Sequence, residues 1–211
     1  MSDLQTITET LITGDAVKLE ELVKKAIDAG ISANDILQIG LIGGMDIVGS
    51  RMESGEMFIP EVLMSGRAMG ISVEILKPLL TGGQASSAGK VIIGTVKGDL
   101  HDIGKNLVVM MIESVGFDVV DLGVDVEPEI FVDAIKEHQP NLVGISALLT
   151  TTMPMMQKTI EAIKESGLKD SLKIIVGGAP VNQAFADEIG ADAYAADAGS
   201  ASKMAKELCV R

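Results

Sequence analysis

The second half of the chain alternates short β-branched apolar runs with amphipathic segments, and this alternation limits the possible folds more than any other feature of the sequence. Apolar runs this continuous are typical of strands that are covered on both faces. Strands that alternate with helical segments favour parallel crossover units. We therefore expect a doubly wound α/β domain with five parallel strands. The apolar runs occupy residues 90–96, 117–124, 141–149, 173–179 and 191–196, and the amphipathic segments occupy residues 103–116, 128–139, 153–167, 182–190 and 200–209.

Residues 2–80 show a helical period instead, because apolar side chains recur three and four positions apart, as at Leu19, Leu22 and Val23. The stretches "DAGIS" and "ESGEMFIP" interrupt this period and divide the segment into about four helices, which predicts a small four-helix bundle. A glycine inside a helix costs about 1 kcal/mol. Those in this segment therefore indicate either close helix contacts or a surface left open for something flat. They are Gly40, Gly43, Gly44 and Gly49.

The change of period falls at "TGGQASSAGK", residues 81–90, which has the composition of a flexible linker. We therefore expect a helical cap domain over residues 1–80 and an α/β domain over residues 91–211. The 211 residues are enough for two small domains, each with its own core.

The charge is acidic in both halves of the chain. Seventeen Lys and Arg residues oppose thirty Asp and Glu residues, which gives a formal net charge of −13. Nucleic acid and anionic membranes are therefore not expected as partners. No apolar run reaches the ~20 residues of a membrane span, and the N-terminus lacks the character of a signal peptide. These features predict a soluble, cytoplasmic protein, and the lone Cys209 cannot form an intrachain disulfide.

The predicted α/β domain has a ligand crevice that its topology locates. For the strand order 2-1-3-4-5, ligands bind beyond the carboxyl ends of the strands, between the first and third strands. The loops that leave those strands are "KGDLHDIG" and "SALLTTT". His101, one of only two histidines in the chain, lies in the first of them.

Asp99 and His101 form a pattern that suits metal ligation or base chemistry. A carboxylate two residues before an imidazole can fold back onto one ring nitrogen, which fixes the tautomer and makes the other nitrogen a better ligand. One imidazole without a neighbouring Cys or second His is poor for binding a bare zinc ion, which needs three or four protein ligands. It suits a metal whose equatorial positions are filled by a macrocycle. The alternative is a buried histidine whose hydrogen bonds are satisfied within the fold.

Small and hydroxyl residues surround this pair in the predicted crevice. Gly104 would let the loop turn closely into its helix, and Gly177 and Gly178 would leave space at the end of the fourth strand. Neutral hydroxyls come from Ser146 and from residues 150–152. A nucleoside triphosphate fits poorly, because "GDLHDIGK" offers one lysine beside two acidic residues.

These stretches together resemble a known family. "DLHDIG" resembles the Asp-x-His-x-x-Gly signature of cobalamin-binding domains, "SAL" their Ser-x-Leu, and "GGAPV" their Gly-Gly segment, in the same order. The bundle and linker are similar to the cap that precedes this domain in methionine synthase and in the small corrinoid proteins of methyltransferase systems. The resemblance covers nearly the whole chain and implies a Rossmann-like, flavodoxin-like cobalamin-binding domain.

The resemblance also implies roles for individual residues. His101 would replace the dimethylbenzimidazole of the cofactor as lower ligand to cobalt, Asp99 would hydrogen-bond the imidazole, and Thr152 would extend that relay from a position where a relative has Ser. Tyr194 would support the nucleotide tail or simply pack. Phe58, on a helical face shared with Val62, Ser65 and Met69, would cover the upper face of the corrin, unless these residues form a core stripe. The cofactor-binding set is thus Phe58, Asp99, Asp102, Gly104, Ser146, Leu148, Thr150, Thr152, Gly177, Gly178 and Tyr194, with His101 as the metal ligand.

The implied function is that of a corrinoid methyl carrier, which is not catalytic on its own. Its expected partners are a substrate-specific methyltransferase, a second methyltransferase that acts on a thiol or tetrahydrofolate, and a reductive activase. The methyl donor stays open among methylamines, betaines, methanol and methoxylated aromatics. Alternatives are a cobalamin-dependent regulator, which would need a DNA-binding module, and a phosphoacceptor receiver, whose lysine after the fifth strand is missing from "ADAYAADAGS". A cobalamin-dependent mutase would need a large barrel for which no residues are left.

Overall fold

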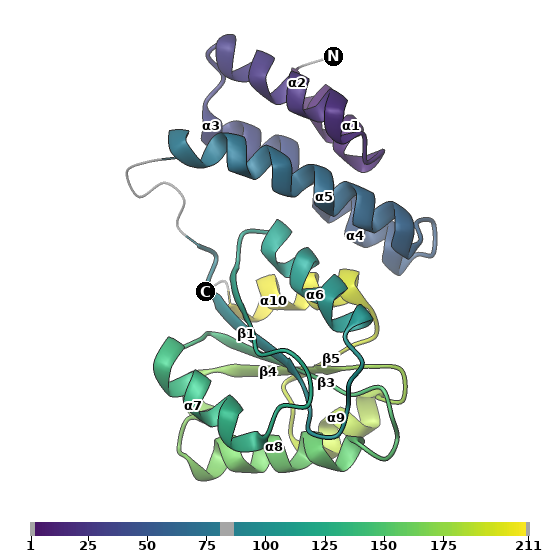
Figure 1. Cartoon of the computed structure of the whole chain (residues 1–211), viewed down its shortest axis with the longest axis vertical. Helices are drawn as coiled ribbons and strands as arrows, with labels where there is room; N and C mark the ends of the chain where they lie inside the picture. Colours follow the sequence, from purple (N-terminus) through teal and green to yellow (C-terminus); the bar gives the residue numbers. More distant parts are fainter. Residues whose placement is uncertain (1–2, 81–86, 210–211) are drawn as a thin grey trace. The chain divides into compact units, whose positions relative to one another are not determined.

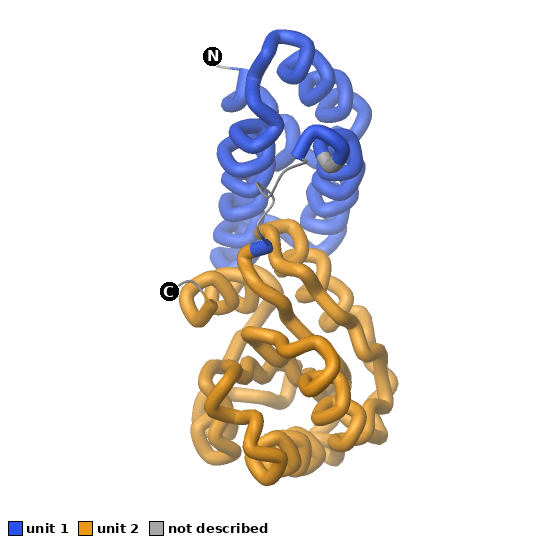
Figure 2. The backbone as a smooth tube through the Cα atoms, turned by 90° about the vertical axis from the view of Figure 1, so that its left-hand side faces the viewer, with its two compact units in different colours: residues 1–87 blue, residues 88–211 orange. Residues whose placement is uncertain are grey.

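The computed structural model describes residues 3–80 and 87–209, and its contacts divide the chain into two compact units, Met1–Ser87 and Ala88–Arg211 (Figure 2). The division falls inside the segment expected to be a linker, residues 81–90. Residues 81–86 of that segment lie outside the described residues.

The first unit is entirely helical in its described part (Figure 1). A π-helical stretch, η1, joins α3 to α4 without a break, so the unit contains four long helical stretches, as the periodicity predicts. The bounds are α1 (Asp3–Ile12), α2 (Ala16–Asp28), α3 (Ala33–Asp35), η1 (Ile36–Ile42), α4 (Gly43–Glu53), α5 (Ile59–Leu76) and the short 3-10 helix η2 (Lys77–Leu79).

Capping side chains start α2 and α3, and a buried apolar face holds the helices of this unit together. Asp15 accepts a hydrogen bond from the backbone N–H of Lys18 at the start of α2, as an N-cap does. The core includes fully buried Leu11 and Leu19. Close packing explains one of the glycines of this unit, because a Cβ on Gly44 would lie 2.7 Å from Leu11 Cδ2 on α1.

The prediction that Phe58, Val62, Ser65 and Met69 share one helical face is wrong. Phe58 precedes α5, and its backbone N–H donates to the Glu61 carboxylate at 2.9 Å, as the N-cap residue of a capping box does. Its side chain is 67% exposed, whereas Val62, Ser65 and Met69 are buried, and the Ser65 hydroxyl donates to the Ile12 carbonyl. These three residues therefore form the core stripe, and Phe58 is separate from it.

The second unit contains the expected five-stranded sheet. All neighbouring strands are parallel, and their order is β2-β1-β3-β4-β5. Residues Val91–Thr95 of β1 pair with Leu142–Ser146 of β3, so Thr95 and Ser146 lie side by side at the carboxyl end of the sheet. The bounds are β1 (Lys90–Thr95), β2 (Asp118–Asp121), β3 (Leu142–Ser146), β4 (Lys173–Gly177) and β5 (Ala193–Ala195).

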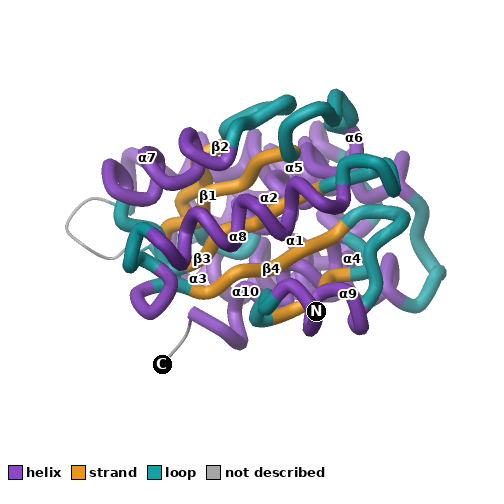
Figure 3. The backbone as a smooth tube through the Cα atoms, turned by 90° about the horizontal axis from the view of Figure 1, so that it is seen from below, coloured by secondary structure: helices purple, strands orange, loops and turns teal. Residues whose placement is uncertain are grey.

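Helices cover both faces of this sheet, which lies between them (Figures 1 and 3). On one face, Phe131 of α7 and Met156 of α8 pack against Ile92 and Val143. On the other face, α6 and α10 cover Val91 and the neighbouring strand residues. The sheet is therefore doubly wound. The helices are α6 (Ile103–Ser114), α7 (Pro128–His138), α8 (Met153–Glu165), α9 (Gln183–Ile189) and α10 (Ala198–Cys209), with the 3-10 turn η3 (Lys169–Ser171) before β4.

Candidate functional site

Two loops meet at the carboxyl ends of β1 and β3, where the strand order reverses. After β1, the backbone N–H of Asp99 donates to the Val96 carbonyl at 3.1 Å and closes a tight turn, in which Gly98 has a φ of 82°. A positive φ at the third position is the requirement of a type II turn. The Val96 N–H in turn donates to the Ser146 carbonyl. The two loops are thus tied together at their roots.

The carboxylate of Asp99 connects the two loops directly. It is fully buried, and its Oδ1 accepts a hydrogen bond from His101 Nδ1 at 2.7 Å. Its Oδ2 accepts from the Thr152 hydroxyl and from the Leu148 N–H, each at 2.7 Å. Asp99, His101, Leu148 and Thr152 are therefore brought together at one carboxylate.

These contacts control the protonation of Asp99. Burial alone would raise the pKa of this carboxyl group, but the hydrogen bonds from Thr152, Leu148 and His101 outweigh burial and hold the pKa well below its usual range. Asp99 is therefore an anion under physiological conditions.

The imidazole of His101 is half exposed, with a side-chain exposure of 50%. Because an ionised carboxylate only accepts hydrogen bonds, Nδ1 is the protonated nitrogen and the lone pair of a neutral imidazole lies on Nε2. No hydrogen bond to Nε2 occurs among the described residues. The backbone carbonyl of His101 accepts from the hydroxyl of buried Thr95 at 3.0 Å, which holds the loop from below.

The donor set decides which kind of metal this imidazole can bind. Within residues 3–80 and 87–209, no three His, Cys, Asp or Glu side chains gather to hold a metal ion. A bare ion would therefore lack ligands. A metal with a macrocycle in its equatorial positions needs only one protein nitrogen, and His101 Nε2 is a nitrogen of that kind without a hydrogen bond in the described residues.

The glycines around the site have different roles. A Cβ on Gly104, in the first turn of α6, would meet nothing within 4 Å, so this position faces open space. A Cβ on Gly177 would approach the Ala195 carbonyl to 3.0 Å, and Gly178, with a φ of 127°, packs directly against the Ala147 backbone. Gly177 and Gly178 are therefore required by backbone packing, whatever they also offer a ligand.

The other predicted residues make no hydrogen bond to the Asp99 carboxylate and lie on several different elements. Asp102 is the N-cap residue of α6, with an exposed side chain that accepts from Asn106. Thr150 is exposed in the loop after β3, and half-buried Ser146 ends that strand. Tyr194 on β5 packs against the core beneath α7, α8 and α9, and Phe58 belongs to the helical unit.

Leu148 was predicted as a site residue, but three features of this region were not predicted: the Thr95 hydroxyl, the use of the Leu148 N–H as a donor to Asp99, and the buried Lys105. Thr95 could have been suspected, because it is a polar residue at the end of an apolar strand. The N–H of Leu148 has no signal in the sequence, since any residue except proline carries one. Lys105 is buried and pairs with Asp121 at the end of β2 and with Asn106. A buried lysine cannot be recognised before its partner is placed.

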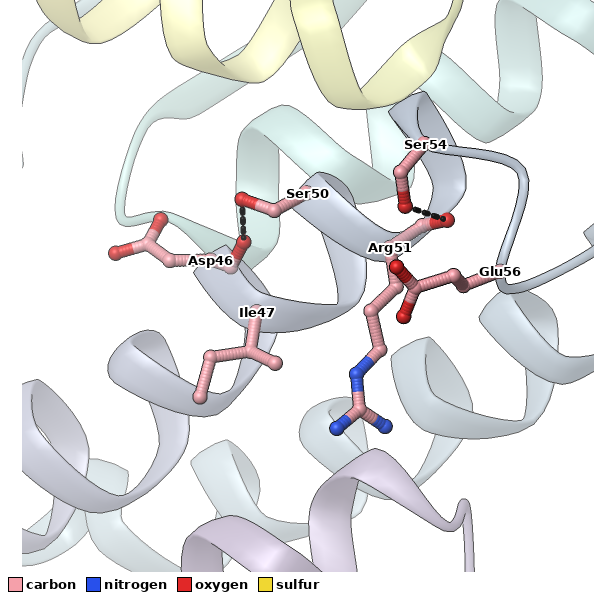
Figure 4. A pocket seen from close by; sticks show the side chains of 6 residues that line it. All are labelled: Asp46, Ile47, Ser50, Arg51, Ser54 and Glu56. Carbon is pink, nitrogen blue, oxygen red and sulfur yellow. Dashed lines mark hydrogen bonds between the residues drawn. The ribbon is translucent and has the colours of Figure 1, made fainter.

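A surface hollow occurs on α4 in the helical unit (Figure 4). The hydroxyls of Ser50 and Ser54 donate to backbone carbonyls of the same segment, those of Asp46 and Arg51. None of the residues predicted for the site lines this hollow. Its lining residues are Asp46, Ile47, Ser50, Arg51, Ser54 and Glu56.

In the described part of the chain, the helices are too short or too polar to cross a membrane.

Comparison with known proteins identifies the family. A model described as "B12 binding domain" matches residues 89–204, and a second model with the same description matches residues 4–77. The chain is 44% identical over 206 residues to dimethylamine corrinoid protein 1 of Methanosarcina acetivorans, and the match covers 97% of this chain and 96% of that protein.

Two solved structures are similar over nearly the whole chain. A cobalamin-binding protein from Desulfitobacterium hafniense matches with a TM-score of 0.85 and 36% identity over 99% of both chains. A methanol:cobalamin methyltransferase complex from Methanosarcina barkeri matches with a TM-score of 0.85 and 31% identity, over 98% of this chain and 79% of that one. The chain therefore belongs to the family of B12-binding corrinoid proteins, whose cofactor is cobalamin or a related corrinoid.

Proposed function

We propose that this chain is a methyl carrier of a corrinoid-dependent methyltransferase system. A substrate-specific methyltransferase would load the methyl group, and a second methyltransferase would pass it to a thiol or to tetrahydrofolate. The carrier would have no catalytic activity of its own. The observation that carries the proposal is the Asp99–His101 pair at the strand-order reversal, with Nδ1 engaged at 2.7 Å and Nε2 available.

The residues of the site fit the cofactor of the family. His101 Nε2 would be the lower ligand to cobalt, and the open space at Gly104 would leave room beside it. When bound, the corrinoid supplies a cobalt centre that accepts and releases a methyl group. Asp99 orients the imidazole, and the Thr152 hydroxyl and Leu148 N–H hold Asp99. Because these contacts do not involve Nε2, they would keep the imidazole aimed whether or not that nitrogen is bound.

The remaining predicted residues would serve the rest of the cofactor. Ser146, Leu148 and Thr150 lie on the end of β3 and the loop after it, where a displaced nucleotide tail would pass. Gly177, Gly178 and Tyr194 lie on the neighbouring strands β4 and β5. Covering of the upper face of the corrin by Phe58 stays a prediction.

The class of methyl donor follows from the relatives. One relative is named for dimethylamine, and one similar structure is a complex that acts on methanol. We therefore propose that a small methylated compound is the donor and that the partner enzyme, rather than this chain, recognises it. A reductive activase would restore the cofactor after accidental oxidation.

A phosphoacceptor role for Asp99 is disfavoured by the same network. A phosphoacceptor carboxylate needs an exposed oxygen, whereas Asp99 is fully buried and both of its oxygens accept hydrogen bonds.

The proposed function is tested with the purified protein loaded with cobalamin. Candidate methyltransferases are supplied together with methylamines, betaines, methanol or methoxylated aromatics, and the methyl group is followed to a thiol or to tetrahydrofolate. At least one pair of enzymes should transfer the group only when the loaded carrier is present. Transfer that proceeds equally without the carrier, or loaded carrier that never receives a methyl group from any donor, would contradict the proposal.

A further inference from the structure

Asp125 has an uncommon backbone conformation for a residue with a side chain. Among the described residues, only Asp125, at φ 57°, and Gln139, at φ 47°, are non-glycine residues with positive φ. Gln139 ends α7, where a left-handed residue is ordinary. Asp125 instead lies in the segment between β2 and α7, directly against the turn that follows β1. Asp and Asn tolerate this conformation better than most residues.

The left-handed conformation directs two groups of Asp125 at that turn. Its backbone N–H donates to the Asp99 carbonyl at 3.0 Å. Its Oδ1 accepts from the Gly98 N–H at 2.8 Å, and its Oδ2 accepts from Lys97 Nζ at 3.2 Å. Three successive residues of the turn are therefore held by one residue. The Gly98 N–H and then Lys97 hold the pKa of Asp125 below its usual range, so the acceptor is a carboxylate at neutral pH.

These contacts reach the site through Asp99. The turn has only one hydrogen bond across it, from the Asp99 N–H to the Val96 carbonyl. Rotation of its central peptide would move the Asp99 backbone, and the carboxylate of Asp99 orients the His101 ring at 2.7 Å. The Gly98 N–H bond to Asp125 opposes that rotation. No hydrogen bond or ion pair joins Asp125 directly to His101.

We propose that Asp125 is a positioning residue for the cofactor ligand: its carboxylate fixes the Lys97–Gly98 turn and thereby holds Asp99 and the His101 imidazole in the ligating geometry.

The test compares three substitutions at one position. Asp125→Gly keeps the positive φ but removes the acceptor. Asp125→Asn keeps both the φ preference and an acceptor oxygen. Asp125→Ser also loses the carboxylate and serves as a second variant if the glycine variant does not fold. Gln139→Gly is the matched control, because it changes the other positive-φ residue at a site that does not contact the turn.

The first measurement is amide hydrogen exchange of the apoprotein. Exchange at Gly98 should be faster in Asp125→Gly and Asp125→Ser by about threefold or more, since one hydrogen bond to a charged acceptor is lost. It should stay near the wild-type rate in Asp125→Asn and Gln139→Gly. Wild-type exchange at Gly98 in the glycine and serine variants would overturn the proposal.

The second measurement is electron paramagnetic resonance of the cobalamin-loaded protein in the cobalt(II) state, in which an axial nitrogen ligand splits the signal. The glycine and serine variants should lose about half or more of the nitrogen-coordinated population, and the asparagine variant should restore it. Full nitrogen coordination in the glycine and serine variants, or an equal loss in Asp125→Asn or Gln139→Gly, would overturn the proposal. This arm rests on the proposed ligation by His101. A wild-type protein without nitrogen coordination would contradict that ligation, while the exchange arm would still test the turn.

Discussion

At the scale of single residues, the site depends on one buried carboxylate that serves two loops. Among the described residues, no lysine or arginine forms an ion pair with Asp99, and its charge is stabilised by N–H and O–H donors, His101 among them. Such donors are directional, so they fix the position of the carboxylate as well as its charge. The imidazole of His101 takes its orientation from this fixed anion. Substitutions at these positions should therefore alter the orientation of the His101 imidazole while the overall fold is kept.

His101→Ala should remove the nitrogen ligand from the cobalt of the loaded protein. The visible spectrum of the cobalt(III) form should shift, and the cofactor should be lost more readily during gel filtration. The matched control is His138→Ala, which removes the other histidine of the chain, on α7. An unchanged spectrum with full retention in His101→Ala would show that another group binds the metal.

Thr152→Val should destabilise the apoprotein by about 1–3 kcal/mol at neutral pH, because Asp99 loses a donor at 2.7 Å. Thr152→Ser keeps the hydroxyl and should lose much less. Tyr194 is the only tyrosine and the chain has no tryptophan, so tyrosine fluorescence during urea unfolding reports on the unit Ala88–Arg211.

The difference in stability between wild type and Thr152→Val should depend on pH in one direction only. The folded-state pKa of Asp99 is depressed, so its contribution to stability is fully present above the unfolded value of about 3.9 and is lost as the pH falls through that value toward the folded pKa. The gap between wild type and Thr152→Val should therefore be constant from pH 7 to about 5 and narrow below about 4. A gap that widens on acidification would contradict this account.

At the scale of elements, alternation of apolar runs and amphipathic segments was enough to predict a parallel five-stranded sheet. The order 2-1-3-4-5, a common one for such sheets, was assumed and is the observed order. The residues at which each strand ends were not predictable, because a strand extends only as far as it forms hydrogen bonds with a neighbouring strand. β5, for example, is only Ala193–Ala195 within an apolar run over residues 191–196. Helical periodicity likewise could not show that Phe58 lies outside α5, since the cap depends on the Glu61 carboxylate. The Asp-x-His pattern predicted the central pair of the site, but Asp125 had no signal, because its role depends on a left-handed backbone conformation in the segment after β2.

Gly104→Ala should have opposite effects on the stability of the apoprotein and on its affinity for the corrinoid. Since the position is helical and a Cβ there meets nothing within 4 Å, alanine should stabilise the apoprotein by about 0.4–1 kcal/mol. The added methyl group would occupy the space proposed for the cofactor, so corrinoid binding should weaken by about 1–3 kcal/mol in a spectroscopic titration.

The control is Gly70→Ala on α5, another helical position where a Cβ meets nothing within 4 Å. It should leave corrinoid affinity unchanged. Unchanged affinity in Gly104→Ala as well would mean that the space at Gly104 is not used by the cofactor.

At the scale of the whole molecule, the chain consists of two units with separate cores, and a family model matches each of them. Every residue of the Asp99 network belongs to the second unit. Exposed apolar side chains occur in both units, Phe58 in the helical unit and Leu100 and Ile103 in the second. The proposed metal ligand therefore lies in the second unit, and protection of the cofactor by the helical unit stays a prediction. The domain limits 1–80, 81–90 and 91–211 stay a prediction.

Limited proteolysis of the apoprotein with subtilisin should first cut within residues 81–90, because Gly, Ser and Ala side chains dominate that segment. Mass spectrometry should identify two fragments that resist further digestion, one helical and one containing Tyr194. A first cut within residues 91–200 would show that the domain boundary lies elsewhere.

The sharing of Asp99 between the loops after β1 and β3 has a thermodynamic consequence. Loops that must be ordered by a ligand subtract that ordering entropy from its affinity. Here a buried anion with donors from both loops ties them together without any ligand, so their freedom is already lost when the polypeptide folds. The surface formed by these two loops is thus preassembled, and under the proposed function a large, rigid ring would dock on it without first having to order the loops.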